Sequence, residues 1–419
     1  MDSSQEDWSS PQPTSPSANG ESNSSVASAS MLPSLQCGLA QAKEDTDTYA
    51  VTFEFLNDGA ANAVFRILPC PPQDTPGFVF KRMGDPVPRS EMLGKVLRIS
   101  KGKPKTLSSD HVVEAFEDQI RPLFRPRLPD PKPVKPIQLP GGRLHDPLAI
   151  LPSTSYEHFL LEHELVDLSK DVTMILLLPQ FGASGLRVGQ QHGQRGIILP
   201  DMSAVPGVSL TVEIKPKWLA QSPNAPQGAY RCRTCALHAK RTATTDLPPP
   251  PYVCPLQLVC GRKDLIERVI KDKLKRHSDG HSDEVVETVT RRAVEYLVTG
   301  PGSELLAHLR HLQVELDPIG VGYRPTSGDF FDGVLLQHRL RQAMTLRDCS
   351  LFLRIPYVKP SLPIEAKLVD LDFKSFAKFP DWMLKEQSLR HGGWYTDLNA
   401  GVDHCLIAEG WRAWVPHYM

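Results

Sequence analysis

The sequence predicts an α/β protein of the α+β type, with a strand-rich N-lobe and a larger mixed C-lobe. Two observations predict this two-lobed fold. Short runs in which apolar and polar residues alternate, as in half-buried strands, dominate residues 49–99. Over much of residues 256–343, apolar residues recur at helical spacing instead. With 419 residues, of which 40% are hydrophobic, the chain can form one large or two modest domains.

The N-terminal segment has a different composition from the rest. Residues 1–47 are rich in Ser, Pro, Asn and Gln and contain few large apolar side chains. Such a segment buries too little surface to offset the entropy of ordering, so we expect a disordered tail. The N-lobe should then span residues 48–180 and begin with a hairpin that turns at Gly59. Its expected elements are strands at residues 49–56, 63–68, 78–82 and 95–99, followed by a helix at residues 112–120.

Prolines and glycines divide the middle of the chain. Residues 122–152 carry many prolines and predict an irregular connection. Residues 171–179 form an apolar run that ends at Pro179, which predicts a buried strand leading to the hinge between the lobes. The C-lobe should span residues 181–419 and open with a Gly-rich loop at residues 181–207, before a strand around Glu213. Its expected helices are residues 256–276, 283–298, 302–313 and 334–343.

Charge and cysteine usage argue against several classes of protein. The formal net charge is −1, so overall electrostatics give no indication of nucleic-acid binding. The eight cysteines are scattered and do not form the dense pattern of a disulfide scaffold. The chain shows neither a signal peptide nor an apolar stretch of the ~20 residues that a membrane span needs. We therefore expect a monomeric intracellular protein of the nucleus or cytoplasm, with no membrane partner.

The most informative motif is residues 212–218, a β-branched strand that ends in lysines on either side of Pro216. Proline fixes φ and removes a hydrogen-bond donor, so the strand should end here. Lys215 and Lys217 alternate along the chain and should point to the same side. With Glu213 two residues before the first lysine, the pattern suits a site that holds several phosphates. A solvated strand end is the alternative.

A second motif lies at residues 367–374. Asp370 and Asp372 occupy alternate positions after an apolar strand, and Lys374 follows two residues later. Paired carboxylates on one face can bind a divalent cation when phosphates supply its other ligands. We therefore predict Asp370 as a metal ligand, with Asp372 either sharing the cation or orienting Lys374.

Together these motifs resemble those of the inositol-pentakisphosphate 2-kinase family, which has Glu-Ile-Lys-Pro-Lys and Asp-Leu-Asp sequences in this order. Three further segments fit the family: a glycine loop at residues 57–64, a strand at residues 96–101 that carries Arg98, and an Asp-Cys-Ser strand that starts at Asp348. Residues 254–256, Cys-Pro-Leu, match another family block. The resemblance covers about residues 50–390 and implies a two-lobed, kinase-like fold.

The resemblance implies transfer of the ATP γ-phosphate to the axial 2-hydroxyl of inositol 1,3,4,5,6-pentakisphosphate, giving inositol hexakisphosphate (phytate), with Mg²⁺ as the metal. Such a transfer needs positioned phosphates, metal ions and an aligned hydroxyl. The implied catalytic residues are Lys215, Asp370 and Asp348, the last as general base. ATP contacts are implied for Gly59, Ala61, Asn62, Val64, Arg98 and Glu213. Substrate contacts are implied for Lys217, Arg241, Lys374 and Lys378, with Arg292 on a helix as a further candidate.

Several of these assignments have simpler alternatives. The Gly59 loop, with a single glycine, fits a plain hairpin turn, and Asp348 fits a strand acid that pairs with Arg347. The charged run at residues 271–276 is interpreted as a solvated helix face. The alternative function is a catalytically weak inositol-phosphate-binding module. A protein kinase is disfavoured because the chain has no His-Arg-Asp or Asp-Phe-Gly motif.

The cysteines offer a separate metal-binding hypothesis. Cys232 and Cys235 are spaced as Cys-x-x-Cys, a common pattern of zinc ligands. Cys254 and Cys260 follow without forming a second such pair, and His238 is an alternative ligand. Free buried thiols are therefore the expectation, and a structural zinc ion is the alternative.

Overall fold

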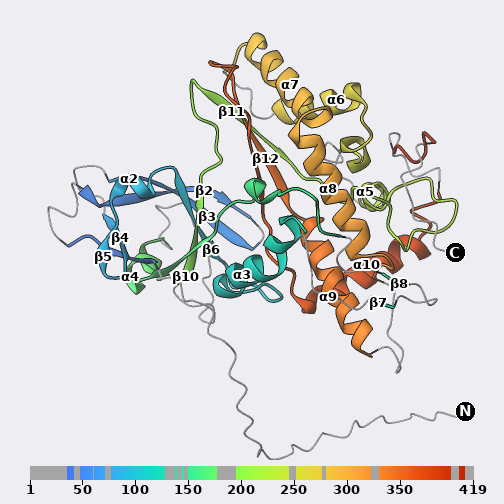
Figure 1. Ribbon diagram of the computed structural model, residues 1–419, viewed down its shortest axis with the longest axis horizontal. Coiled ribbons are helices and arrows are strands. Elements are labelled where there is room, and N and C mark those ends of the chain that lie inside the picture. Colours follow the sequence, from blue (N-terminus) through green and yellow to red (C-terminus); the bar gives the residue numbers. More distant parts are fainter. Residues whose placement is uncertain are drawn as a thin grey trace, which may run out of the picture.

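The computed structural model describes residues 35–41, 48–59, 61–70, 77–127, 137–138, 144–145, 150–176, 195–244, 252–275, 280–321, 330–397 and 405–410. It contains both helices and strands in quantity, which confirms the predicted α+β class. Figure 1 shows two lobes: a strand-rich one from the first half of the chain, and a larger one in which long helices flank a smaller sheet.

The N-lobe is built on an eight-stranded sheet with the order β1-β9-β10-β6-β3-β2-β4-β5. Because β1 also pairs with β4, the sheet closes on itself. Alternate side chains fill its interior, as Ala63, Phe65 and Ile67 do along β3. The strands are β1 (Leu35–Leu39), β2 (Val51–Asp58), β3 (Asn62–Pro69), β4 (Phe78–Arg82), β5 (Asp85–Pro86), β6 (Lys95–Ser100), β9 (Glu164–Leu168) and β10 (Arg195–Pro200).

The sequence does not predict four of these strands, β1, β5, β9 and β10. β1 lies within the segment expected to be disordered, and β10 lies within the expected Gly-rich loop. In β1, Leu35 and Cys37 are buried at alternate positions while the strand pairs with β4 and β9. The N-lobe sheet therefore extends beyond residues 48–180 on both sides. A five-residue strand in a Ser-rich context carries too little local pattern to be recognised, and its partners lie far away in the sequence.

The predicted strand at residues 171–179 is wrong where the structure describes it. Residues Lys170–Leu176 form the helix α4 instead. Ser169 starts this helix, because its hydroxyl accepts a hydrogen bond from the Val172 amide at 3.3 Å. Val172 and Leu176 are buried one helical turn apart, so tertiary packing overrides the β propensity of the run. Pro179 and the expected hinge lie outside the described residues.

The connection between the lobes starts as a helix, as predicted for residues 112–120. The helix α3 (Ser109–Ala115) continues as a π-helical turn, Phe116–Ile120, and a 3-10 turn, Arg121–Phe124. Val112, Phe116 and Ile120 are buried at helical spacing. Within the stretch expected to be irregular, β7 (Ile137–Gln138) and β8 (Leu144–His145) pair with each other. The described part of this half of the chain also contains the helix α2 (Arg89–Met92) and a 3-10 turn, Glu157–Phe159, which packs against β13.

The C-lobe is built on an antiparallel three-stranded sheet with the order β11-β12-β13. Its strands are β11 (Ser209–Ile214), β12 (Ser350–Pro356) and β13 (Glu365–Val369). The largest apolar core joins this sheet to the surrounding helices. The helices are α5 (Arg233–Ala243), α6 (Lys263–Leu274), α7 (Asp283–Val298), α8 (Pro301–Leu316), α9 (Phe330–Leu346) and α10 (Phe379–His391), with 3-10 turns at Pro255–Leu258 and Phe376–Lys378.

Four of these helices confirm the periodic patterns in the sequence. The helices α7, α8 and α9 coincide closely with the predicted residues 283–298, 302–313 and 334–343. The prediction for residues 256–276 is interrupted, because the chain passes from the 3-10 turn through Gly261, at φ +74°, before α6 begins. That positive φ favours glycine and explains the break.

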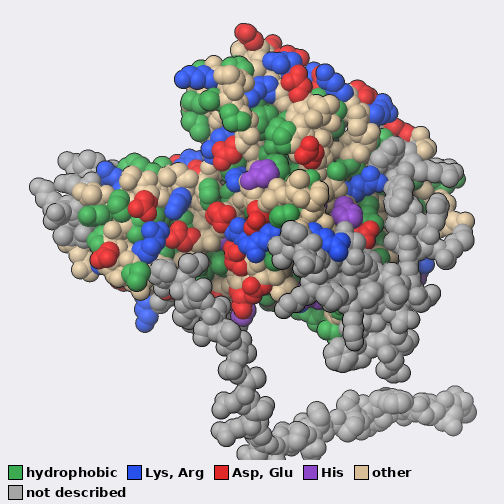
Figure 2. All heavy atoms as spheres, viewed as in Figure 1, with side chains coloured by type: hydrophobic (Ala, Val, Ile, Leu, Met, Phe, Trp, Pro, Cys, Tyr) green, Lys and Arg blue, Asp and Glu red, His purple; other side chains and the backbone are tan. Residues whose placement is uncertain are grey.

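The surface of the face in Figure 2 carries acidic and basic side chains in a mixed pattern, in line with the formal net charge of −1. Within the part of the chain that the structure describes, no helix has both the length and the apolar character needed to cross a membrane.

The strand β1 provides a direct test of the revised N-lobe. Leu35 is 0% exposed and Leu39, in the same strand, is 36% exposed. We expect Leu35→Ala to lower the free energy of unfolding by about 2–5 kcal/mol, because it leaves a cavity in the core, whereas Leu39→Ala should cost much less. Urea denaturation of both variants provides the measurement. Equal and small losses for both would show that β1 does not belong to the folded lobe.

Candidate functional site

The predicted site residues emerge together at one end of the small sheet. Because β12 runs antiparallel to both neighbours, it begins where β11 and β13 end. Ile214 pairs with Leu351, and Val369 pairs with Ser350. We call this end of the sheet the site edge. Five predicted site residues lie just beyond the strand ends at this edge. They are Lys215 and Lys217 after β11, Asp348 before β12, and Asp370 and Asp372 after β13.

Asp348 lies between two lysines at the site edge. Lys217 Nζ is 3.1 Å from Asp348 Oδ1, and Lys374 Nζ is 2.6 Å from Asp348 Oδ2. Partial burial raises the pKa of Asp348, but the ion pairs with Lys374 and Lys217 outweigh it and hold the pKa at about 2. The alternative in which Asp348 pairs with Arg347 is wrong, because Arg347 points into the core and binds Asp317 at 2.5 Å.

The backbone around Lys217 is held in place by buried side chains of neighbouring helices. Lys217 has a φ of 53°, in the left-handed region that side chains other than glycine rarely adopt. Gln313 donates to the Lys217 carbonyl at 2.8 Å and accepts from the Leu219 amide at 2.9 Å. The Trp218 ring lies 3.6 Å from the Arg347 guanidinium and 4.4 Å from that of Arg233. This packing holds the strained backbone in one position.

Asp372, the second of the two aspartates after β13, connects the two lobes. Arg98, on β6, lies 2.8 Å from Asp372 Oδ1, and Asn62, on β3, donates to Asp372 Oδ2 at 3.4 Å. Arg98 is only 4% exposed, so it is not the surface arginine that an edge strand would carry. Burial raises the pKa of Asp372, but Arg98 and Lys374 outweigh it and lower that pKa. Asp372 is therefore oriented by the N-lobe.

Asp370 differs from Asp372 in having no direct ion pair with any described residue. It is accessible to solvent and has a φ of 58°. The protein around the cleft still displaces enough water to raise its pKa; Arg98 opposes this effect and Asp372 adds to it. An accessible carboxylate without a partner, beside a second carboxylate, is a suitable arrangement for binding a cation.

Glu213 and Lys215 form a further pair at the site edge. Glu213 Oε1 accepts a hydrogen bond from the Ser350 hydroxyl at 2.8 Å and lies 3.3 Å from Lys215 Nζ. Burial raises the pKa of Glu213, but the Ser350 hydrogen bond and Lys215 outweigh it and lower that pKa. Lys215 is thereby fixed as a cation close to Asp370 and Asp348.

The expected nucleotide loop closes the β2–β3 hairpin beside Arg98. The Gly59 amide donates to the Asn62 carbonyl at 2.9 Å, and Val64 pairs with Arg98 across β3 and β6. Ala61 is fixed through its carbonyl, which accepts from the Lys101 amide at 2.8 Å. Lys101 also donates its ammonium group to the Gly59 carbonyl at 2.8 Å. Sequence reasoning did not single out this lysine.

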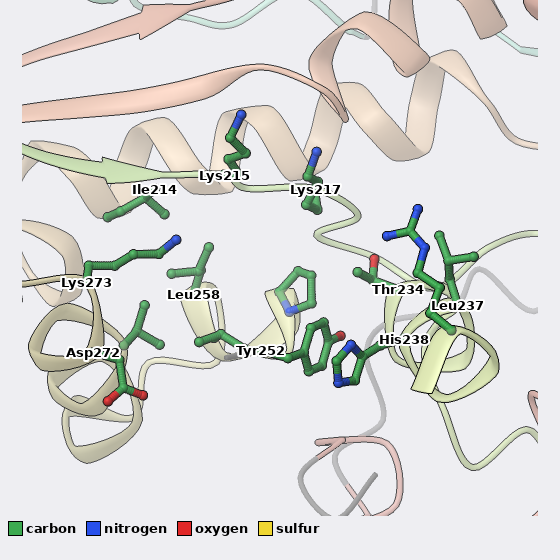
Figure 3. Close-up of a pocket in the computed structure, with 14 residues that line it drawn as sticks. Ile214, Lys215, Lys217, Thr234, Leu237, His238, Tyr252, Leu258, Asp272 and Lys273 are labelled. Carbon is green, nitrogen blue, oxygen red and sulfur yellow. The ribbon is translucent and has the colours of Figure 1, made fainter. Parts of the chain in front are cut away.

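A lysine-rich cavity of about 250 Å³ opens next to the site edge. It is lined by Lys215 and Lys217 from the end of β11, Arg241 from α5 and Lys273 from α6. Figure 3 shows Lys215 and Lys217 on the same side of their segment, as alternation predicts, whereas Lys273 lies on the other side of that segment, near Ile214 and Leu258. Lys273 belongs to the run interpreted as a solvated helix face, so that interpretation is wrong for this residue.

Two lysines of the last helix border the same region. Lys378 is the N-cap of α10; burial lowers its pKa, and the nearby Lys374 lowers it further. Lys385 lies two turns later, where burial and then Arg233 and Arg241 lower its pKa. The family motifs in the sequence imply Lys378 but not Lys385. Its position seven residues after Lys378, on the same helix face, was the available signal.

Arg292 is not brought to the site. Its guanidinium donates to the carbonyl groups of Pro356 and Leu362. Pro356 ends β12, whereas the site edge lies at Ser350, where that strand begins. The structure therefore removes Arg292 from the candidate phosphate contacts. The helical pattern around Arg292 was real, but it could not indicate which end of the sheet the helix meets.

Four cysteines lie close together next to the segments that line the cavity. The sulfur atoms of Cys232, Cys235, Cys254 and Cys405 all lie within 4.8 Å of one another, and all four residues are buried. Of the other candidate ligands, Cys254 joins the cluster, whereas Cys260 donates to the Gln257 carbonyl and His238 stacks on Tyr252. Four thiolates at zinc-ligand distances of ~2.3 Å lie about 3.8 Å apart, so this four-cysteine centre fits a tetrahedral zinc ion.

Comparisons with known proteins agree with the motifs. A family model described as inositol-pentakisphosphate 2-kinase matches residues 55–388, which confirms the resemblance. A curated protein from Yarrowia lipolytica with the name inositol-pentakisphosphate 2-kinase is 35% identical over 202 residues. That alignment covers 48% of this chain and 57% of the relative, so the chain spans little more than half of the relative's length.

Proposed function

We propose, because this chain belongs to the inositol-pentakisphosphate 2-kinase family, that it transfers the ATP γ-phosphate to the 2-hydroxyl of inositol 1,3,4,5,6-pentakisphosphate. The product is inositol hexakisphosphate. The observation that carries the proposal is the site edge itself. Three features meet in this region: a carboxylate held by two lysines, Asp348, a pair of candidate metal ligands, and a cavity lined by four cationic side chains.

The nucleotide is assigned to the side of the site where the lobes meet. Arg98 and Asn62 from the N-lobe converge on Asp372 there, and Lys215 lies nearby. ATP phosphates placed beside these groups would complete the ligands of a Mg²⁺ ion held by Asp370 and Asp372. Such an ion would neutralise charge on the transferring phosphoryl group. The solvent-accessible carboxylate of Asp370, without an ion-pair partner among the described residues, supports this assignment.

The inositol phosphate is assigned to the lysine-rich side. We infer that its phosphates bind Lys217, Lys374, Lys378 and Arg241, and we add Lys273 and Lys385 as further candidates. Lysine acts on phosphate as a point charge, whereas arginine can form two parallel hydrogen bonds. Phosphates that engage Lys217 and Lys374 weaken their ion pairs with Asp348, so the pKa of Asp348 should rise from about 2. The carboxylate then becomes a better acceptor for the proton of the 2-hydroxyl.

One observation favours the alternative of a catalytically weak binding module. A Cβ added to Gly59 would come no closer than 3.5 Å to another atom, the Asn62 carbonyl oxygen, so ordinary side chains fit at this position. The loop therefore has the properties of a plain hairpin turn. A module of this kind should bind inositol phosphates and ignore ATP, with or without magnesium.

One assay tests the proposal against this alternative. Purified protein is incubated with ATP, Mg²⁺ and inositol pentakisphosphate, and the products are separated by anion-exchange chromatography. The proposal requires inositol hexakisphosphate and ADP in equal amounts. Tight binding of inositol pentakisphosphate without ATP binding or turnover would identify a binding module instead.

Replacement of Asp348 should separate chemistry from binding. General-base catalysis contributes about 10²–10⁴-fold, so we expect Asp348→Asn to lower kcat by about that factor. Binding of inositol pentakisphosphate should be unchanged or slightly tighter, because a negative charge is removed beside a polyanion. The matched control is Asp381→Asn, another exposed carboxylate, which pairs with Lys105 at 2.9 Å. A lower melting temperature with an unchanged kcat per folded molecule would show that Asp348 has only a structural role.

We also propose that zinc occupies the four-cysteine centre. Buried thiols at these mutual distances support a structural site without an open ligand position. Cys405→Ser should reduce bound zinc well below one ion per chain and lower the melting temperature, while Cys260→Ser should change neither. Metal analysis by mass spectrometry and thermal denaturation provide the measurements. The assignment would be contradicted if the wild-type protein contained no zinc and the melting temperature of Cys405→Ser equalled that of the wild type.

A further inference from the structure

The four-cysteine centre and the lysine-rich cavity share their building segments. Thr234 lines the cavity and precedes the ligand Cys235. Val253 and Pro255 line it on either side of the ligand Cys254. The polypeptide that binds the metal therefore also forms one side of the cavity. Cys405 differs from the other cysteines, because it comes from the C-terminal region and no described residue near it in the sequence lines the cavity.

Side-chain contacts connect the centre to the cavity directly. The Tyr252 hydroxyl donates to Cys235 Sγ at 3.0 Å. The Tyr252 ring stacks on His238, with centroids 4.1 Å apart and planes at 11°. Figure 3 shows these two rings side by side at the edge of the cavity. Any movement of Cys235 therefore reaches two cavity-lining side chains through one hydrogen bond and one ring contact.

The helix α5 provides a second connection. Cys232 is the N-cap of α5, where its sulfur accepts from the Cys235 amide at 3.4 Å, so two of the four cysteines fix the start of the helix. Two turns later the same helix presents His238 and Arg241 to the cavity. An eleven-residue helix is only marginally stable by itself, and its position depends on such tertiary anchors.

We propose that the metal in the four-cysteine centre sets the affinity of the cavity for inositol phosphate, because it fixes α5 and Tyr252 against the lysines that follow β11. This inference rests on the proposed function and adds a form of regulation to it. The ATP side of the site should be largely independent of the metal. Lys215 borders both sides, but Arg98 and Asn62 belong to strands of the other lobe, and Asp370 and Asp372 do not line the cavity. Loss of the metal should therefore weaken the binding of inositol phosphate and leave the binding of ATP unchanged.

Three variants and the wild-type protein test the coupling. Cys405→Ser removes a metal ligand that does not line the cavity, and Tyr252→Phe breaks the hydrogen bond to Cys235 while all four cysteines remain. Cys260→Ser is the matched control, because that thiol lies outside the centre. Zinc content is measured for each, together with Kd for inositol pentakisphosphate and for ATP with Mg²⁺, by titration calorimetry.

We expect Cys405→Ser to lose zinc and to bind inositol pentakisphosphate at least about five-fold more weakly, within the usual range of coupling between sites. Tyr252→Phe should keep zinc and bind inositol pentakisphosphate about two- to ten-fold more weakly, which corresponds to the free energy of one hydrogen bond. The ATP Kd should stay within a factor of about two in both variants, and Cys260→Ser should match the wild type.

Two results would overturn the coupling. One is unchanged affinity for inositol pentakisphosphate in zinc-depleted Cys405→Ser. The other is unchanged affinity in Tyr252→Phe, which decides the question if Cys405→Ser fails to fold. Failure of the proposed function looks different, because the zinc-loaded wild type would then either not bind inositol pentakisphosphate or bind it without ATP binding or turnover.

Discussion

The antiparallel register of the three-stranded sheet is the constraint on which the site depends. β12 lies between β11 and β13, so the start of one strand and the ends of two others meet. Residues more than a hundred positions apart thereby become neighbours. Slippage of β12 by one residue would turn Asp348 away from both lysines, because successive side chains point to opposite faces. The apolar residues that fix this register, including Val212, Leu353 and Leu368, are therefore part of the functional design.

Left-handed backbone accompanies this convergence. Lys217 and Asp370 both have positive φ, and each lies just beyond a strand that ends at the site edge. Such conformations in residues other than glycine occur where the surroundings determine them, and they are concentrated at functional sites. Gln313 and the Arg347–Trp218–Arg233 stack hold Lys217 in place. These turns redirect the chain, so that Lys217 faces Asp348 and the Asp370 carboxylate faces the boundary between the lobes.

Local motifs made much of the site predictable. Alternation predicted Lys215 and Lys217 on one side, the paired acids predicted Asp370 and Asp372 as candidates, and the resemblance to the family added Asp348 and Lys374. The residues that were missed depend on contacts distant in sequence. Lys273 resembles its exposed neighbours until α6 is packed against β11, and Cys405 joins Cys232 across 173 residues. Arg292 shows the opposite error, since a correct helix was assigned to the wrong end of the sheet. In the N-lobe, β1 and α4 were missed for the same reason: their partners and burial are not encoded locally.

The central claim is that the lysines around Asp348 serve the inositol phosphate and not ATP. It is tested most directly by Kd values for both ligands in Lys217→Ala and Lys374→Ala. A charge-assisted contact is worth roughly 1.5–3 kcal/mol. Each variant should therefore bind inositol pentakisphosphate about one to two decades more weakly, with the loss shrinking as salt rises, while ATP affinity is unchanged. Equal losses for both ligands would contradict the claim and would indicate either a shared phosphate site or a general loss of folding.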